Sequence, residues 1–423
     1  MSASTTNDAA VLQLTLHGVL VGYLAGFTQG RNVLSFAESF QDNLERPTFS
    51  LITHPKTTTA ANIMSEPWAR RQRLHPVLSN LLPEGVLREL VAQALKVHVD
   101  NEFHILSRLG KDLPGAIVAS PMDPEQVPDH VLNSHGKGRA IKFEDTVQEN
   151  RFSLAGVQMK FSMKEMDGRY NLATDNELGD WIVKTPSTKH KFVPLNEYTA
   201  MRLAQMTGVD IPEIKLVEMS QIDSLPQINL PDEQFAFAIK RFDREGNQRI
   251  HMEDFAQVMV KYPHEKYSSA NYENIGSIVY NYSGDGLADV QQFARRLLVN
   301  ILLANGDAHL KNWSFSYPDA ITPRLSLAYD IVTTRVYIES ESRYALNMAS
   351  TKEWYEVSMN HFQSWATRVG IPWRAIVPHL SETLSLAREL WPEALKGMPM
   401  DEGQKDGLRA HWRQLHEDFR IAC

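Results

Sequence analysis

The sequence predicts a mixed α+β protein, with a small β-containing region at the N-terminus and a largely helical region at the C-terminus. Three patterns support this prediction. Apolar and polar residues alternate from Leu12 to His17, as in a half-buried strand. Strand candidates punctuated by glycine alternate with helix candidates between residues 151 and 245. From Asp289 to Ala304, apolar residues recur every three or four positions, which is the pattern of an amphipathic helix.

Composition sets the broad class of the protein. The chain has 423 residues, of which 43% are hydrophobic and 22% charged, and this is typical of a packed globular protein of two or three domains. The net charge of −8 disfavours wrapping of nucleic acid by the whole molecule. The single cysteine, Cys423, cannot form an internal disulfide or a cysteine-based zinc site, which fits a reducing compartment. No apolar run approaches the ~18 residues of a membrane span, so we expect a cytoplasmic protein.

The first part of the chain is expected to form an accessory subdomain over residues 11–118, after a disordered tail at 1–10. Residues 119–150 are rich in proline, glycine and polar residues, and we interpret them as a linker. In chain order, the expected elements are strands at 11–27 with a turn at His17-Gly18, strand material at 33–52, a helix from Pro83 to Val91, and a helix from Glu102 to Leu109 that stops at Gly110.

Two further regions are expected, at 151–245 and at 246–423. The first should contain the sheet, and the second should be mostly helical. The expected elements are strands at 152–162, 181–184 and 235–241, helices at 195–206 and from Asp289 to Asn305-Gly306, a strand at 325–330, and only helices from Thr351 onwards.

A short loop after the long helix carries the strongest chemical signal. Asp307 and Asn312 are five residues apart, and this spacing suits phosphoryl transfer: a carboxylate accepts the proton of the attacking hydroxyl, and an amide oxygen helps to hold Mg²⁺. Asp330 follows a strand candidate and could supply a second Mg²⁺ ligand. Alternatively, Asp307 and Asn312 only cap a turn. His309 is more often a structural residue than a metal ligand.

Two other segments could contribute to a nucleotide site. Residues Ser153 to Lys160 contain a single glycine, which is a weak phosphate-loop signal. Lys184 ends a strand candidate, as a phosphate-pairing lysine does, and Glu197 on the next helix could pair with it. The alternative is a surface lysine and an acid favoured by the helix dipole. The strand edge at 235–244 could offer backbone groups to an adenine, or be an edge strand protected by its charges.

In chain order, these motifs resemble those of the HipA-like toxin kinases. The matching motifs are Ser153-Leu-Ala-Gly-Val-Gln-Met-Lys160, Lys184, Asn196-Glu197, Arg241-Phe-Asp-Arg244, Glu253-Asp-Phe255, Gly306-Asp-Ala-His-Leu-Lys-Asn312 and Tyr329-Asp330. Before them, Asn80-Leu-Leu-Pro-Glu-Gly85 and Arg108 to Ala116 look like the N-terminal subdomain of the family. The resemblance covers roughly residues 11–400. It implies a kinase-like fold in which 151–245 is the nucleotide-binding lobe.

The resemblance also implies an ATP- and Mg²⁺-dependent serine/threonine protein kinase. Asp307 would be the catalytic base, Asn312 and Asp330 would hold Mg²⁺, and Lys184 would pair with the ATP phosphates. Autophosphorylation of Ser153 would silence the enzyme, because a phosphate beside ATP repels the nucleotide. The other residues expected to contact the nucleotide are Ala155, Gly156, Val157, Gln158, Met159 and Lys160 in the phosphate loop, the backbone of Lys240, Arg241 and Phe242 at the adenine, and His309, Lys311 and Tyr329.

Members of this family act as growth-arresting toxins. The implied partners are a protein substrate such as an aminoacyl-tRNA synthetase and a helix-turn-helix antitoxin, which would provide most of the affinity for operator DNA. A basic cluster beside Trp68 (Arg70, Arg71 and Arg73) either contacts nucleic acid or is a solvated helix face. The chain departs from the family at Lys240, where the hinge usually has Glu, and after Asp330, where a glycine is missing.

Two other readings of the same residues remain open. A small-molecule kinase would use the same transfer chemistry, since fold and motif do not choose the acceptor. A degenerate kinase could serve as a binding or co-repressor module. The joint presence of Lys184, Asp307, Asn312 and Asp330 argues against the latter.

Overall fold

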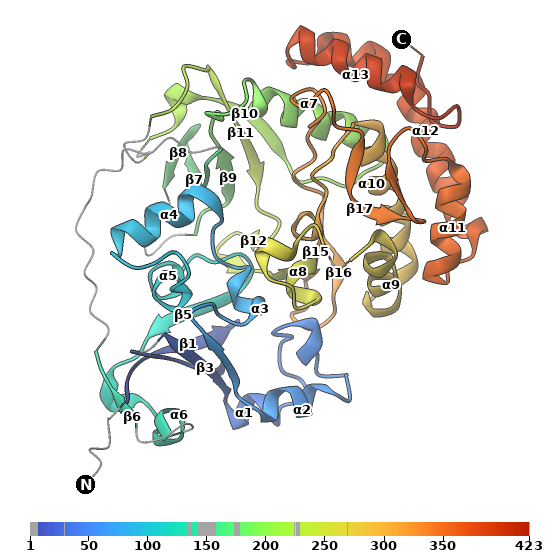
Figure 1. Ribbon diagram of the computed structural model, residues 1–423. Helices are drawn as coiled ribbons and strands as arrows, with labels where there is room; N and C mark the ends of the chain where they lie inside the picture. Colours follow the sequence, from blue (N-terminus) through green and yellow to red (C-terminus); the bar gives the residue numbers. More distant parts are fainter. Residues whose placement is uncertain are drawn as a thin grey trace.

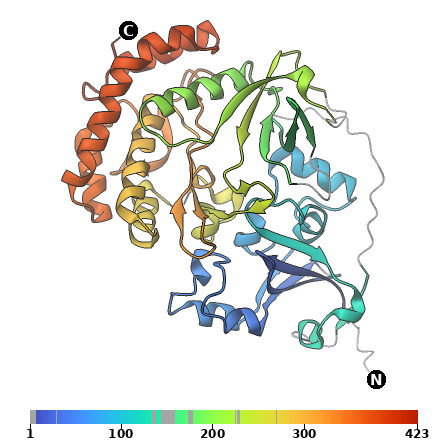
Figure 2. The same cartoon turned by 180° about the vertical axis from the view of Figure 1, so that it is seen from behind.

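A computed structural model describes residues 7–28, 30–133, 138–142, 158–172, 178–223, 225, 229–268 and 270–422. It confirms the expected α+β class. The N-terminal sheet lies at one end of the molecule, a second sheet lies next to it, and helices of the C-terminal region form the opposite side (Figure 1). Seen from behind, the last three helices form an outer layer along that side (Figure 2).

The N-terminal sheet has the strand order β4-β3-β2-β1-β5, and β6 pairs in parallel with the start of β1. Alternation along β1 places Leu12, Leu14 and Leu16 in the larger core of this region, whereas Val11 lies in a cluster on the opposite face. Both faces of the sheet are therefore covered. The elements are β1 (Asn7–Leu16), β2 (Val19–Phe27), β3 (Arg31–Phe36), α1 (Glu38–Gln41), α2 (Ala60–Ser65), β4 (Trp68–Arg71), α3 (Pro76–Ser79), α4 (Gly85–Ala94), α5 (Glu102–Leu109), β5 (Ile117–Pro121), α6 (Asp129–Asn133) and β6 (Gly138–Ala140).

Two segments of this region differ from the sequence-based prediction. The strand material expected over 33–52 ends at Phe36, and α1 follows. The polar residues after it, up to Pro47, do not alternate with apolar residues as a strand requires. Pro47 also lacks the N–H group that a central strand needs for its hydrogen bonds. Arg70 and Arg71 lie on β4 at the edge of the sheet and not on a helix. Charged side chains at such an edge oppose pairing with another chain.

The segments expected to be tail and linker are also partly structured. Strand β1 begins at Asn7, within the expected tail 1–10. In the expected linker 119–150, β5 continues to Pro121 and is followed by α6 and β6. The apolar side chains of Val127, Val131 and Leu132 pack on the face of the sheet that carries Val11. Their burial there explains why this proline-rich stretch folds against the N-terminal sheet.

The second sheet is antiparallel, with the order β10-β11-β9-β7-β8. Its strands are β7 (Lys160–Met166), β8 (Arg169–Leu172), β9 (Trp181–Lys184), β10 (Ile214–Glu218) and β11 (Phe235–Lys240). Helix α7 (Val193–Met206) packs on one face through Ala200 and Met201. On the other face, Leu90 of α4 lies in a cluster with Met163 and Trp181, and both views show α4 beside these strands (Figures 1 and 2). A helix of the N-terminal region thus completes the core of the second sheet.

Helix α10 is the centre of the C-terminal region. Residues 293–302 of this helix are all buried, and Trp354, Trp365, Trp391 and Trp412 lie fully buried in the same core. The helix ends at Leu302, earlier than expected, and β18 precedes the helices expected from Thr351 onwards. The elements are β12 (Arg244–Glu245), β13 (Gln248–Arg249), β14 (His251–Asp254), α8 (Phe255–Val258), α9 (Tyr272–Tyr282), α10 (Gly286–Leu302), β15 (Ser314–Tyr317), β16 (Arg324–Leu325), β17 (Arg343–Met348), β18 (Thr351–Glu353), α11 (Met359–Val369), α12 (Trp373–Gly397) and α13 (Glu402–Gln414).

Among the described residues, no helix is long and apolar enough to cross a membrane.

Candidate active site

The loop after α10 is fixed by hydrogen bonds from its own side chains. The chain leaves the helix through Ala304, whose φ of 53° is left-handed. Asn305 then accepts a hydrogen bond from the amide of Asp307 at 3.1 Å. The Asn312 amide nitrogen donates to the carbonyl of Asp307 at 2.7 Å. This last bond commits Nδ2 of Asn312 to the loop, so its Oδ1 is the atom that could ligate a cation.

Lys184 lies between two carboxylates in the interior of the molecule. The residue is 3% exposed, and its ammonium contacts both Glu197 on α7 and Asp330. The predicted pairing of Lys184 with Glu197 is confirmed, and the alternative of a surface lysine is wrong. Lys160 binds the second oxygen of Asp330 at 2.8 Å. Four charged groups from two strands, a helix and a loop therefore meet at one point.

These contacts hold Lys184 and Asp330 in their charged forms. Burial alone lowers the pKa of Lys184, but the Asp330 and Glu197 carboxylates outweigh it and hold this pKa above its ordinary value. Burial alone raises the pKa of Asp330, but Lys160 and Lys184 outweigh it and hold this pKa well below its ordinary value. Asp330 is thus an anion and Lys184 a cation at neutral pH, as phosphate and Mg²⁺ binding require.

The structure brings the two predicted Mg²⁺ ligands together. Asn312 and Asp330 line one small cavity of about 10 Å³, together with Asn305. The strand expected to end at Asp330 stops at Leu325, and Asp330 itself has a left-handed φ of 55°. Such a backbone is sparsely populated and is often held at functional sites. A carboxylate and an amide oxygen fit Mg²⁺, which usually completes its shell with substrate phosphates and water.

Only part of the predicted phosphate loop can be placed. Ser153, Ala155, Gly156 and Val157 lie outside the described residues. The side chain of Met159 is buried in the core of the second sheet, so it belongs to the packing. The side-chain nitrogen of Gln158 is buried and has no hydrogen-bond partner within the described residues. A buried amide of this kind is a ready donor for an oxygen of a ligand.

Lys311 and His309 make contacts other than the expected nucleotide contacts. The Lys311 ammonium binds the carbonyl of Asn80 at 2.9 Å and ion-pairs with Glu84 at 3.3 Å and with Asp254 at 3.2 Å. It therefore anchors the loop after α10 to the N-terminal region. His309 is 5% exposed, and burial lowers its pKa to about 4. It is a neutral, packed residue beside Asp307.

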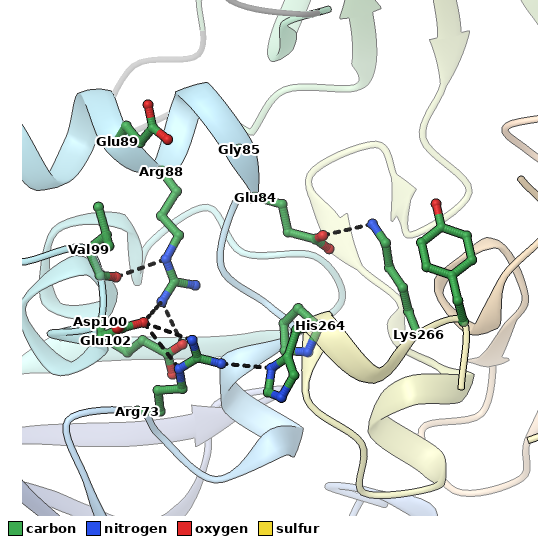
Figure 3. Close-up of a pocket in the computed structure, with 12 residues that line it drawn as sticks. Arg73, Glu84, Gly85, Arg88, Glu89, Val99, Asp100, Glu102, His264 and Lys266 are labelled. Atoms are coloured by element: carbon green, nitrogen blue, oxygen red, sulfur yellow. Dashed lines mark hydrogen bonds and ion pairs between the residues drawn. The ribbon is translucent and has the colours of Figure 1, made fainter. Parts of the chain in front are cut away.

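Sequence reasoning missed two residues in the segment that contacts the Asp307 loop. The Tyr267 hydroxyl donates a hydrogen bond to the carboxylate of Asp307. Next to it, Lys266 pairs with Glu84 at 2.8 Å, an interaction drawn in Figure 3. Glu84 stands in the N-terminal motif that the sequence had suggested, but neither Tyr267 nor Lys266 has a motif or a spacing that could have identified it.

The predicted adenine hinge is already partly hydrogen-bonded. The amide of Lys240 donates to Glu213 and that of Arg241 to Asp180, each at 2.8 Å. These two amides are therefore already committed to the fold. The ring of Phe242 stacks on Tyr329 with 5.7 Å between centroids, and this aromatic pair stands next to Asp330 in the chain.

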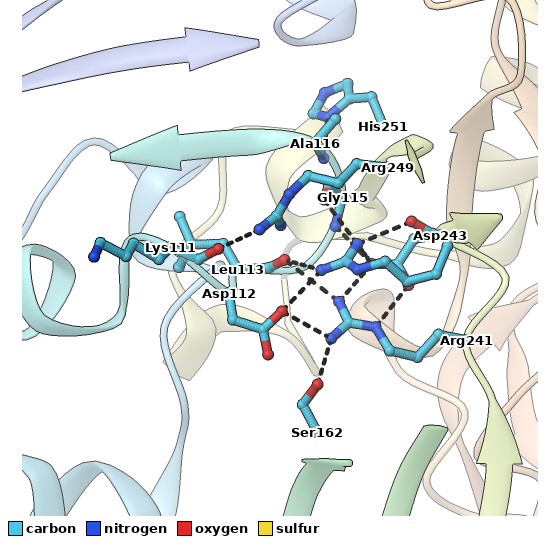
Figure 4. A network of polar contacts seen from close by, with 11 residues as sticks. Lys111, Asp112, Leu113, Gly115, Ala116, Ser162, Arg241, Asp243, Arg249 and His251 are labelled. Carbon is cyan, nitrogen blue, oxygen red and sulfur yellow. Dashed lines mark hydrogen bonds and ion pairs between the residues drawn. The ribbon is translucent and has the colours of Figure 1, made fainter. Parts of the chain in front are cut away.

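A charged network fixes the same segment to the N-terminal region (Figure 4). Asp243 binds both Arg241 at 2.7 Å and Arg244 at 2.9 Å. Both guanidinium groups also reach Asp112 of the N-terminal region, and Arg241 donates to Ser162 on β7 at 2.9 Å. The Arg241 side chain therefore has a structural role.

Comparison with known proteins identifies relatives over nearly the whole chain. Models of the HipA N-terminal domain and of the HipA-like C-terminal domain match residues 12–120 and 152–391. A Sinorhizobium fredii protein with a kinase name is 37% identical over 407 residues, which cover 95% of this chain and 96% of the relative. The serine/threonine-protein kinase toxin HipA of Shewanella oneidensis is 24% identical over 80% of this chain and 81% of its own.

A solved structure supports the same assignment. The Shewanella oneidensis complex of HipA, HipB and operator DNA contains a chain that superposes with a TM-score of 0.70 at 19% identity, over 95% of each chain. This match confirms the expected kinase-like fold. The two domain models, the relatives and the shared fold agree, and the chain belongs to the HipA-like kinase family.

Proposed function

We propose that the protein is an ATP- and Mg²⁺-dependent serine/threonine protein kinase of the cytoplasm that arrests growth as the toxin of a toxin–antitoxin pair. The observation that carries the proposal is the buried contact of Lys184 with Glu197 and Asp330, next to the loop of Asp307 and Asn312. A purely structural role does not need a buried lysine between two carboxylates, because burying these charges is costly.

Each side chain has a task in this proposal. Lys184 binds the phosphates of ATP once they replace its contact with Asp330. Asn312 and Asp330 hold Mg²⁺, which neutralises charge on the phosphates. Asp307 accepts the proton of the attacking hydroxyl. The backbone of Lys240 to Phe242 faces the adenine, and the backbone of residues Ala155 to Lys160 covers the phosphates.

The same proposal includes the regulation and the partners. Ser153 is the site of autophosphorylation, which silences the enzyme. The cellular substrate is a component of translation such as an aminoacyl-tRNA synthetase. A helix-turn-helix antitoxin neutralises the protein and links it to operator DNA; the HipA–HipB–DNA complex of the Shewanella oneidensis relative supports a partner of this kind.

Mass spectrometry after incubation with Mg²⁺-ATP tests the proposal. The wild type should gain one phosphate on Ser153, whereas Ser153→Ala and Asp307→Asn should not. If a wild type that starts unphosphorylated and binds ATP gains no phosphate, the acceptor is a small molecule or the protein is a binding module.

A further inference from the structure

A pocket of about 360 Å³ lies between the N-terminal region and the short segment before α9. Figure 3 shows its wall of charged side chains, most of which are paired with one another. The charged residues that line it are Arg73, Glu84, Arg88, Glu89, Asp100 and Glu102 from the N-terminal region, and Lys266 from the segment before α9.

This pocket reaches the proposed catalytic base. Tyr267 lines the pocket, and its hydroxyl donates a hydrogen bond to Asp307. The carbonyl of Lys266 accepts a hydrogen bond from the amide of Leu310 at 3.2 Å, which ties the pocket wall to the catalytic loop. The wall of the pocket therefore contacts Asp307 through the side chain of Tyr267.

We propose that this pocket binds the acceptor polypeptide, a segment with charged side chains beside a serine or threonine, and that the Tyr267 hydroxyl occupies the place on Asp307 that the acceptor hydroxyl takes. The inference rests on the proposed kinase function and deepens it. A general base must lie within hydrogen-bond reach of the hydroxyl whose proton it accepts. The Tyr267 hydroxyl holds Oδ1 of Asp307, and in this inference the acceptor hydroxyl takes that same oxygen by displacing Tyr267.

The charges of the pocket favour a polypeptide. Small-molecule sites are lined mostly by apolar and aromatic side chains, whereas charged side chains line both sides of this pocket and most of them are ion-paired. The pair of Arg73 with Asp100 is partly exposed, with side chains 38% and 29% accessible, so exchanging one partner for a charge on a peptide costs little. The pair of Arg88 with Glu102 is much more buried and keeps the wall in place.

The transfer step is balanced without any further reactant. The acceptor oxygen forms a bond to the γ-phosphorus, the bond from that phosphorus to the bridging oxygen of ADP breaks, and Asp307 takes the proton. Before an acceptor binds, the Tyr267 hydroxyl occupies the base. Water is then not deprotonated, and ATP is not wasted by hydrolysis.

The first test measures ATP hydrolysis by the full-length protein in the absence of an acceptor, so that water is the attacking group. Tyr267→Phe removes the hydroxyl and keeps the ring, and it should raise hydrolysis by about tenfold as the base becomes accessible to water. Tyr282→Phe, an exposed tyrosine on α9, is the matched control and should hydrolyse ATP at the wild-type rate. Unchanged or slower hydrolysis by Tyr267→Phe overturns the inference.

The second test measures transfer to dephosphorylated casein, an acidic protein acceptor. Arg73→Glu should raise the KM for casein with little change in kcat. Arg70→Glu makes the same charge change on the exposed edge strand outside the pocket, and it should leave the KM as it is. Equal effects of both variants would show a general charge effect and contradict a docking pocket.

The wild type distinguishes the two levels of failure. If the wild-type protein neither phosphorylates itself nor hydrolyses ATP, the proposed kinase function is wrong, and the inference of an acceptor pocket is wrong as well. If it phosphorylates itself normally while Tyr267→Phe behaves like the wild type in hydrolysis, only the acceptor pocket is wrong.

Discussion

At the scale of single residues, two carboxylates of the site have different surroundings and therefore different expected tasks. Asp307 contacts a tyrosine hydroxyl, whereas Asp330 contacts two ammonium groups. Asp307→Asn should lower phosphate transfer by about 10²- to 10⁴-fold and leave ATP affinity nearly unchanged. Asp330→Ala should weaken Mg²⁺-dependent ATP binding itself, by about tenfold or ~1.4 kcal/mol.

Calorimetric titration of ATP with and without Mg²⁺, together with transfer assays, separates the two variants. Asp401→Asn, at the start of α13 and far from the site in sequence, serves as the control for loss of a carboxylate. Transfer at the wild-type rate by Asp307→Asn would show that another group is the base.

Glu253 gives a pH-dependent prediction. Its buried carboxylate accepts hydrogen bonds from the Ser50 hydroxyl at 2.8 Å and the Leu51 amide at 2.7 Å, and also from Tyr317. Burial outweighs these donors and raises the pKa of Glu253 from 4.5 to about 7. Because the folded state then holds a proton that the unfolded state releases, the free energy of unfolding should fall as pH rises through this window, by at most about 1.4 kcal/mol per pH unit.

Urea unfolding at a series of pH values measures this slope. Glu253→Gln should flatten it, since the amide has nothing to titrate, and the exposed Glu245→Gln should retain the wild-type slope. If the free energy of unfolding depends on pH with the same slope in the wild type and in Glu253→Gln, the pKa of the buried Glu253 carboxyl group is not raised.

The sequence could predict those charged residues of the site that a recognisable strand or helix pattern positions. Lys184 ends an apolar strand and Glu197 lies on the next helix, so their pairing followed from the order of elements. It could not predict Tyr267 at Asp307 or Lys311 at Glu84, because those contacts join segments that only the tertiary fold brings together. The same limit explains why the Arg241 guanidinium, which binds Asp112, was not expected to be structural.

At the scale of elements, helix α4 connects two parts of the fold. Leu90 is 4% exposed and packs on Met163 and Trp181 of the second sheet. Leu90→Ala should lower the free energy of unfolding by about 2–5 kcal/mol, because it leaves a cavity in this cluster. Leu44→Ala, at a side chain that is 77% exposed, should change it by less than about 0.5 kcal/mol.

Urea denaturation of both variants checks this prediction. A loss below 1 kcal/mol for Leu90→Ala would indicate that α4 is only loosely attached to the sheet.

Elements with strong periodicity were predicted well. The amphipathic pattern of α10 and the apolar run of β9 gave their positions to within a few residues. Elements with a weak or mixed pattern were not: α6 and β6 follow a proline-rich stretch, and their contacts with the N-terminal sheet stabilise them.

At the scale of the whole molecule, the network around Asp243 connects the two regions of the chain. Asp243 is buried and neutralises Arg241 and Arg244, which also reach Asp112. Asp243→Asn leaves two buried guanidinium groups with less compensation and should cost about 3–5 kcal/mol. The exposed Asp232→Asn should cost almost nothing.

Both variants can be compared by urea unfolding followed through tryptophan fluorescence, since Trp68 reports on the N-terminal region and Trp354 on the C-terminal core. The two regions should unfold together in the wild type. A stability loss of less than about 1 kcal/mol for Asp243→Asn would show that this network contributes little net energy.

The contact of Lys311 with Asn80 and Glu84 has an evolutionary consequence. Lys311 belongs to the loop after α10, whereas Asn80 and Glu84 belong to the N-terminal region. A substitution on one side of this contact therefore requires a compensating substitution on the other. A gene fusion that exchanges the N-terminal region for that of a distant relative should therefore give a poorly active chimera. Restoring the native residues at these three positions should recover part of its activity, and inheritance of the two regions as one unit follows from the same constraint.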